Sequence, residues 1–305
     1  MLKKRKQVRK VKHRTWVLWL MILPAIIAIF IFNYLPMYGI QLAFREYNFS
    51  TGISGGTFVG LKYFKQFINN FQFPVIMRNT FVICLVNLLF TFPAPILLAL
   101  LFNQIKNKKR KGIMQTMTYL PHFVSLVVVV SILSLLFSPE TGIIGQHLRN
   151  SDGSVINLLG SAKSFLWVYV FSEIWQHSGW NAIIYLAALS SVDPQLYDAA
   201  KMDGANRWQL LRYVDIPAII PSMMILLILS MGNLLNANFD KIYLLQNTMN
   251  LSASEVLSTY VYKLGIESNQ FSYAAAIGLF STIINVVFLL VTNRLSKKTA
   301  DMSLW

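Results

Sequence analysis

The side chains that most often perform chemistry are few in this chain and lie apart from one another. Its four histidines, His13, His122, His147 and His177, occur in separate segments. Ser178 directly follows His177, but adjacent residues point apart on a helix and do not form a nucleophile–base pair. The sequence has no Gly-x-x-x-x-Gly-Lys-Ser/Thr phosphate loop, no His-Glu-x-x-His helix and no cysteine pair. We therefore predict no enzymatic site, no metal site and no cofactor bound by this chain.

A polar stretch between two long apolar runs has the clearest local signals. Asp193-Pro194 is typical of a helix N-cap followed by proline at the first helical position, and Gly204 is expected to break that helix. Asn206, with Gln209 three residues later, can cap a second short helix. Pro217 closes the stretch where the next apolar run begins. Two short helices joined by a bend make a docking surface; the alternative is a solvated connector between two spans.

The elements around this stretch are those of a membrane protein. The chain has 305 residues, of which 55% are hydrophobic and only 13% charged, and its mean hydropathy is +0.52. A soluble domain carries about twice that charged share. Six apolar runs reach the ~20 residues that a helix needs to cross the hydrocarbon layer: about 16–40, 75–102, 113–137, 164–190, 217–238 and 272–292. Backbone groups in lipid must be hydrogen-bonded within the segment, so we predict an all-α membrane protein with six transmembrane helices.

The basic residues predict how these helices are oriented. Eight lie in the tail over residues 1–15, five in the loop 103–112, three in the loop 191–216 and three near the C-terminus. If six helices alternate, all of these lie on one side, and the remaining eight lie in longer loops on the other side. The positive-inside rule then places both termini and the 191–216 loop in the cytoplasm. We expect one transmembrane domain over residues 16–305 after the basic tail.

The formal net charge of +15 is also typical of nucleic-acid-binding proteins. Here the basic residues flank the spans and do not gather on one soluble face, so membrane orientation and contact with anionic lipid explain them more simply. We expect membrane lipid as a partner and no nucleic acid.

Five motifs resemble those of one known family. The hallmark of that family is Glu-Ala-Ala, three residues, Gly, nine residues, then Ile-x-Leu-Pro. Its counterparts here are Asp198-Ala199-Ala200, Gly204 and Val214-x-Ile216-Pro217, with the spacing kept. Further matching motifs are Pro36-Met37-Tyr38-Gly39, Phe92-Pro93-Ala94-Pro95, Tyr119-Leu120-Pro121-His122-Phe123 and Ile184–Leu189 followed by Asp193–Tyr197. With these motifs the chain resembles, over essentially its whole length, the carbohydrate-uptake permeases of binding-protein-dependent type I ABC importers, in the lipoprotein-linked polysaccharide and oligosaccharide branch.

The resemblance implies a fold and a set of partners. The fold is the MetI-like permease fold, in a bacterial cytoplasmic membrane. The partners are a second, similar permease, two cytoplasmic ATPase subunits that use ATP and Mg, and an extracellular solute-binding lipoprotein that delivers an oligosaccharide. The polar loop is then a coupling helix seated in a groove of the ATPase. Its coupling residues are predicted to be Asp198, Ala199, Ala200, Asp203, Gly204, Arg207, Trp208, Leu211 and Pro217, with Trp208 and Leu211 as buried apolar anchors in the partner.

A sugar site should combine polar groups with flat aromatic faces at mid-span depth. Candidates that meet this description, on three helices to which the resemblance also points, are His122, Ser125, Glu173, Gln176, Trp180, Asn181, Asn233 and Asn236. Each type of residue has another interpretation. Asparagine in a span often bonds a neighbouring helix, tryptophan often marks the membrane interface, and Glu173 could form a salt bridge to the partner permease.

Two other functions fit the same pattern of spans. The first is an ABC permease whose cargo is a peptide or an amino acid. The second is a self-contained channel or secondary transporter, in which loop 191–216 is only a connector. Dependence on a separate ATPase subunit distinguishes the second from the leading interpretation.

Overall fold

The computed structural model describes residues 2–50, 52–149, 153, 155–236, 239–300 and 303–304, and most of these residues are helical. The α-helices, in chain order, are α1 (Leu2–Ile29), α2 (Lys62–Ile68), α3 (Phe73–Thr91), α4 (Pro93–Asn103), α5 (Lys108–Tyr119), α6 (Leu126–Phe137), α7 (Ala162–Ser190), α8 (Pro194–Met202), α9 (Arg207–Leu210), α10 (Ile216–Gly232), α11 (Phe239–Leu245), α12 (Leu251–Ser254), α13 (Leu257–Tyr262) and α14 (Phe271–Ala300). Tighter 3₁₀ turns cover Leu35–Phe44, Leu120–Phe123, Gly145–His147 and Leu234–Asn236, and π-helical turns cover Phe30–Tyr34, Leu211–Asp215 and Lys263–Glu267.

The described residues fall into two compact units. Unit 1 comprises those within Met1–Phe67 and Leu264–Leu279, and unit 2 comprises those within Ile68–Lys263 and Phe280–Trp305. In unit 1 the Ser272 hydroxyl accepts a hydrogen bond from the Tyr47 amide at 2.9 Å. The side chains Ala43, Phe67, Ala274, Ala276 and Ile277 are buried there. Unit 2 holds almost all of the residues predicted from the sequence to be functional.

Four helical segments are long and apolar enough to cross a membrane. They are Trp16–Phe44, Phe73–Asn103, Arg207–Gly232 and Phe271–Lys298, and each contains or overlaps a predicted span. Helix α7 is 29 residues long, which at 1.5 Å per residue is about 44 Å and exceeds the thickness of the hydrocarbon layer. It is outside this set because its middle carries polar side chains, including Glu173, Gln176 and Asn181.

The third predicted span, 113–137, is not one straight helix. The segments Lys108–Phe123 and Leu126–Phe137 meet at an angle of 97°. Pro121 lies in the 3₁₀ turn at the break, and the backbone after it is extended at Val124 (ψ 129°) and Ser125 (ψ 146°). A proline in a spanning helix predicts a kink, but hydropathy counts apolar residues and not backbone direction, so the size of this bend does not follow from the sequence.

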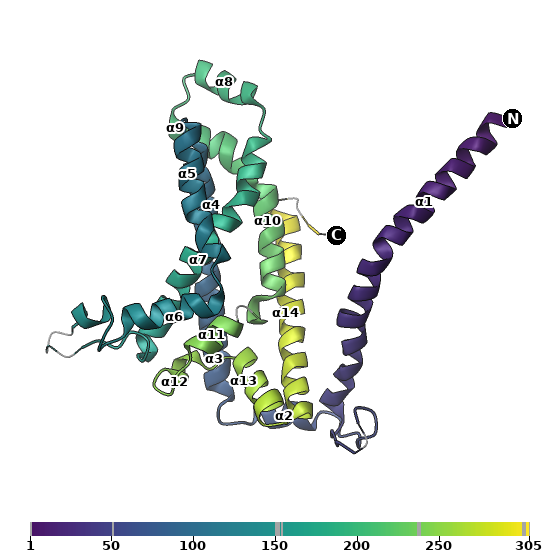
Figure 1. The fold of residues 1–305 in the computed structure, drawn as a ribbon, viewed down its shortest axis with the longest axis vertical. Coiled ribbons are helices and arrows are strands. Elements are labelled where there is room, and N and C mark those ends of the chain that lie inside the picture. The colour runs from purple at the N-terminus through teal and green to yellow at the C-terminus, as the bar shows by residue number, and fades with distance from the viewer. Residues whose placement is uncertain are drawn as a thin grey trace. The chain divides into compact units, whose positions relative to one another are not determined.

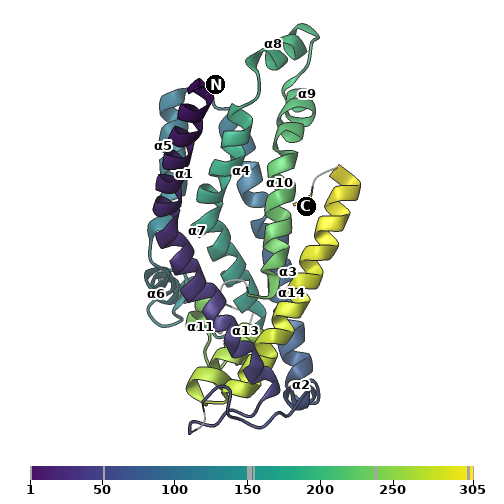
Figure 2. The same ribbon diagram turned by 90° about the vertical axis from the view of Figure 1, so that its right-hand side faces the viewer.

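The core of unit 2 is built on α7. Figures 1 and 2 both show α7 running alongside α4 and α10. Ala99 of α4 and Ala182 of α7 are fully buried in one apolar cluster with Ile219 of α10. Small side chains allow helix backbones to approach closely, which is how membrane helices associate without a strong hydrophobic drive.

A second apolar cluster surrounds the first half of α7. It joins Phe165 and Tyr169 of α7 to Ile83 of α3, Val130 of α6 and Ile242 of α11. Helix α7 is therefore in contact with neighbours along most of its length, and the polar residues at its middle lie between two packed regions.

Gly179 marks the closest approach between α5 and α7. A Cβ atom added to Gly179 of α7 would collide with the carbonyl oxygen of Thr118 in α5. A Cβ atom added to Gly112 of α5 would meet nothing within 4 Å. We expect Gly179→Ala to destabilise the protein by ~1–3 kcal/mol, because the helices would have to separate. Thermal unfolding in detergent measures this. Gly112→Ala is the control and should be neutral or slightly stabilising; equal melting temperatures for the two variants would contradict the close approach.

Candidate functional site

The polar loop after α7 forms the predicted pair of short helices. The Asp193 side chain accepts from the Gln195 amide at 2.9 Å, which caps α8. Gly204 ends that helix with φ +80°, a left-handed conformation that glycine adopts at little cost. Asn206 and Gln209 form the expected reciprocal capping box at the start of α9. The local predictions for this loop are confirmed, and Figure 2 shows α8 and α9 at one end of unit 2.

A buried carboxylate that the sequence analysis missed holds this loop in place. Asp215 is fully buried and accepts hydrogen bonds from Asn103 Nδ2 at 3.0 Å, Gln104 Nε2 at 3.2 Å and Tyr197 Oη at 2.6 Å. These bonds join α8, the end of α4 and the start of α10. Burial, with the hydrogen bond to Asp215 as a second cause, raises the pKa of Tyr197 to about 12. The feature of the sequence that could have indicated this buried carboxylate is one acidic residue between two apolar ones, Val214 and Ile216.

The surface of the loop combines charge with large exposed apolar side chains. Met202 is 88% exposed and Trp208 79% exposed, and Leu196 and Tyr213 are exposed as well. Exposed apolar side chains on a polar loop are typical of protein interaction sites. Of the predicted coupling residues, those that are also exposed are Asp198, Ala199, Asp203, Gly204, Arg207 and Pro217, and Ala200 is half-buried.

Leu211 has a contact that the prediction of a coupling surface did not include. Its side chain is partly buried and packs against the α4–α7–α10 core cluster, so it also attaches the loop to the rest of the chain. Trp208, Leu196 and Met202 are apolar side chains on the loop that are open to contact.

A groove separates α8 and α9 from the end of α4. Its volume is about 700 Å³, and its charged lining residues are Lys106, Asp198, Lys201 and Arg207. Lys201 and Asp198 pair at 3.0 Å, which leaves two further basic side chains in the lining. The groove therefore has a net positive lining.

The middle of α7 carries a buried ion pair. Lys241 Nζ of α11 lies 2.6 Å from Glu173 Oε1 and 3.1 Å from Gln176 Oε1. Glu173 is 5% exposed, Gln176 3% and Lys241 1%. Glu173 therefore has a cationic partner within its own chain, and its alternative role, a salt bridge to a second permease, stays a prediction. The sequence analysis assigned Lys241 to an outer loop and missed it, because its contact with α7 depends on how α11 folds back.

Two histidines and a tryptophan extend this polar cluster. His122 Nδ1 and His177 Nδ1 are 3.1 Å apart, and the rings of His122 and Trp180 stack in parallel with centroids 4.7 Å apart. His177 Nε2 is 3.9 Å from Glu173 Oε1. The structure thus brings four of the predicted sugar-binding residues, His122, Glu173, Gln176 and Trp180, into one connected group, which His177 joins together.

Asn181 lies in a separate small cavity. The cavity has a volume of about 230 Å³ and is lined by Asn181 and Tyr185 of α7, Thr91 of α3 and Ser230 of α10, together with apolar side chains. Hydroxyl and amide groups at this density can bond the hydroxyls of a small polar ligand.

The three remaining candidates for sugar contact lie outside both the connected polar group and the small cavity. Ser125 is an exposed residue at the bend before α6. Helix α10 ends at Gly232, so Asn233 caps it and Asn236 lies in the following 3₁₀ turn. Asn236 Oδ1 accepts from the Ser281 hydroxyl of α14 at 3.3 Å, as expected of an asparagine that bonds a neighbouring helix. Asn233 and Asn236 therefore do not share a face of α10, because the helix stops before them.

Comparison with known proteins places this geometry in context. Residues 91–301 match the family model described as "Binding-protein-dependent transport system inner membrane component". The chain is 41% identical to the polygalacturonan/rhamnogalacturonan transport system permease protein YteP of Bacillus subtilis (strain 168), over 94% of this chain and 90% of that protein. It is 39% identical to protein LplB of the same organism, with the same shares covered.

Solved structures resemble the whole chain. The fold matches a chain of a bacterial ABC transporter involved in the import of the acidic polysaccharide alginate, with a TM-score of 0.86 and 34% identity over 96% of this chain and 99% of that chain. A second match, with the same TM-score and identity, comes from the alginate ABC transporter in complex with an alginate pentasaccharide-bound periplasmic protein.

The buried pair of Glu173 and Lys241 generates a prediction about stability. Lys241→Met leaves the Glu173 carboxylate buried without its cation, and we expect a loss of ~3–5 kcal/mol. Glu173→Gln combined with Lys241→Met removes both charges and should cost less than Lys241→Met alone. Denaturation in detergent of the wild type, both single variants and the double variant gives the coupling. Additive losses would contradict a direct interaction.

Proposed function

The chain belongs to the family of inner membrane components of binding-protein-dependent transport systems, and from this premise we propose that it is the permease subunit of an ATP-driven ABC importer for an oligosaccharide or polysaccharide fragment. Members of this family are multi-pass proteins of the bacterial cell membrane and are transport components, not enzymes. The resemblance noted in the sequence is thereby confirmed.

Six spans with both termini in the cytoplasm are part of this proposal. The four long apolar segments and the bent pair account for five, and α7 is the sixth because Glu173 and Gln176 at its middle are buried and paired with Lys241. The asymmetry of basic residues supports a cytoplasmic position for α8 and α9.

The observation that carries the proposal is the geometry of the α8–α9 loop. Asp215 ties the loop to α4 and α10, and Met202 and Trp208 are exposed on it. A stiff contact of this kind can carry the movement of an ATPase subunit into the membrane helices as a rigid-body change. ATP and Mg are bound by that separate subunit.

The cargo and the remaining partners follow from the relatives. The substrates that their names give are polygalacturonan, rhamnogalacturonan and alginate, which supports a saccharide cargo over a peptide or amino acid. An extracellular solute-binding protein delivers the cargo, as the complex with a periplasmic protein suggests for the solved relative. A second, similar permease completes the pathway.

Within this chain, the sugar path runs along α7. Trp180 is 40% exposed and offers an aromatic face, with His122 and Asn181 as hydrogen-bonding groups. Glu173 and Gln176 are occupied by Lys241 and position the helix at this level. Ser125, Asn233 and Asn236 remain candidates at the edge of the path.

The first prediction of this proposal concerns the ATPase. Met202→Glu puts a charge in place of an exposed apolar side chain, and we expect at least about a tenfold loss of co-purifying ATPase subunit. Gln209→Glu is the matched control: it adds the same charge to the loop and keeps the capping box intact. Equal losses in both variants, or none in either, would contradict an apolar contact at Met202.

The second prediction concerns the cargo. Trp180→Ala removes the aromatic face, so sugar and binding protein should no longer stimulate ATP hydrolysis in the reconstituted complex, while basal hydrolysis persists. Trp19→Ala, which removes an exposed tryptophan from α1, is the control. Wild-type stimulation in the Trp180 variant would show that the sugar path lies elsewhere.

A further inference from the structure

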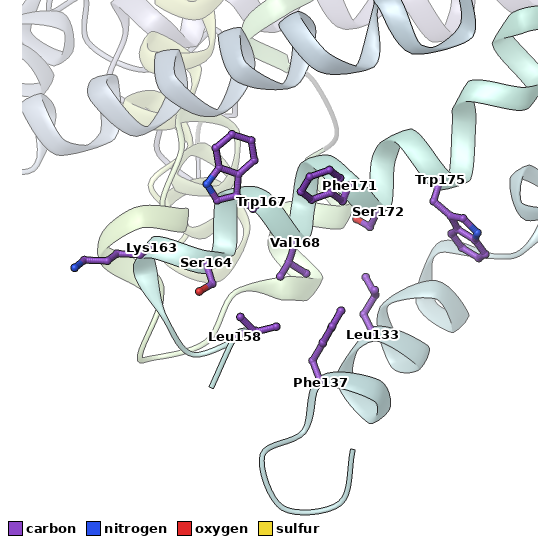
Figure 3. Close-up of a pocket in the computed structure, with 10 residues that line it drawn as sticks. All are labelled: Leu133, Phe137, Leu158, Lys163, Ser164, Trp167, Val168, Phe171, Ser172 and Trp175. Carbon is purple, nitrogen blue, oxygen red and sulfur yellow. The ribbon is translucent and has the colours of Figure 1, made fainter. Parts of the chain in front are cut away.

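An apolar groove between α6 and α7 lies apart from the features assigned above. Its volume is about 500 Å³, and it is lined by Leu133, Phe137, Leu158, Lys163, Ser164, Trp167, Val168, Phe171, Ser172 and Trp175. This volume is within the range of about 300–1,000 Å³ that is typical of small-molecule sites. Figure 3 shows the α7 side chains lining one wall, and Leu133 and Phe137 of α6 lining the other.

The polarity of the groove changes along its length. Lys163 and Ser164 lie at the start of α7, and Phe171 and Trp175 lie two to three turns further along the helix (Figure 3). Twelve residues of helix separate Lys163 from Trp175, which is about 18 Å. The groove is therefore charged at one end and aromatic or aliphatic along the rest.

The lining does not suit a sugar. Ser172 already donates its hydroxyl to the Tyr169 carbonyl at 2.7 Å, so the main polar groups left in the lining are Lys163, Ser164 and the indole N–H groups of Trp167 and Trp175. A saccharide carries a hydroxyl on most of its carbons. Burying these hydroxyl groups against apolar side chains without hydrogen-bond partners is unfavourable in free energy. The ligand must be apolar over most of its length.

The lysine at the end of the groove indicates that the ligand also carries a negative charge. Lys163 is exposed, and within the described part of the chain no salt bridge pairs it. Trp167, one turn further along α7, is of the residue type that marks the headgroup level of a bilayer. A long apolar body ending in an anion, at this depth, matches the chemistry of a charged membrane lipid.

We propose that this groove binds one acyl chain of an anionic phospholipid whose phosphate pairs with Lys163. The proposal rests on the proposed function only for the membrane leaflet from which the lipid comes. If α8 and α9 are cytoplasmic, the opposite end of α7, where Lys163 lies, is at the outer surface, and the lipid belongs to the outer leaflet. The bound lipid fills the space between α6 and α7. It thereby supports α6, which is connected to α5 through the sharp bend after Pro121.

Lipid retention by the purified complex tests the site. The complex is equilibrated with mixed vesicles of phosphatidylglycerol and phosphatidylcholine, extracted in mild detergent, and its retained lipids are measured by native mass spectrometry. The wild type should keep phosphatidylglycerol preferentially. Lys163→Glu should lower that preference by about fivefold, from the loss of one basic contact, and Val168→Trp should abolish retention by filling the groove.

Two matched variants serve as controls. Lys65→Glu changes an exposed lysine on α2, and Leu97→Trp enlarges an exposed side chain on α4 outside the groove; both should retain lipid like the wild type. Wild-type retention in both groove variants would overturn the proposal. Loss of the second permease from the Val168→Trp complex would also overturn it, because the groove would then be a protein interface. Lipid is measured without sugar or ATP, so failed transport with retained lipid would count against the proposed function alone.

Discussion

The burial of the Asp215 carboxylate is the interaction on which the proposed coupling depends. A charge without exposure to water is tolerated only with several hydrogen-bond donors, and Asn103, Gln104 and Tyr197 supply them. Because these donors come from the end of α4 and from α8, and Asp215 itself directly precedes α10, one side chain fixes the loop to two helices of the core, α4 and α10. A push on α8 is then transmitted to α4 and α10 and is not absorbed by a flexible connector.

Helix α7 meets two demands that ordinarily conflict. It packs against α4 and α10 at one end and α3, α6 and α11 at the other, yet its middle is polar. Lys241 reconciles these demands, because it neutralises Glu173 and occupies Gln176. The remaining groups, His122, His177 and Trp180, stay partly open and able to meet a ligand. The polarity that keeps α7 from being recognised as a spanning helix is thus the property that suits it to line a path.

The sequence predicted well what local chemistry decides. The caps of α8 and α9 and the break at Gly204 follow from residue type at fixed spacing, and all are found as expected. It predicted less well where several helices meet. Leu211 was predicted to contact a partner, and only the folded chain shows that it also packs against the core. A proline at position 121 indicates a kink, but an apolar run does not give its size, and the structure shows a bend of 97°.

By itself, the sequence determined that the chain is helical, that it belongs in a membrane and which family it resembles, and it located the loop for which docking is proposed. These depend on composition and on spacings within about twenty residues. Only the tertiary structure decided that Lys241 reaches Glu173, that Asp215 gathers three donors, and that α6 and α7 enclose a groove. Each joins residues that are far apart in the chain, and such contacts depend on the path of the backbone between them, which no local pattern records.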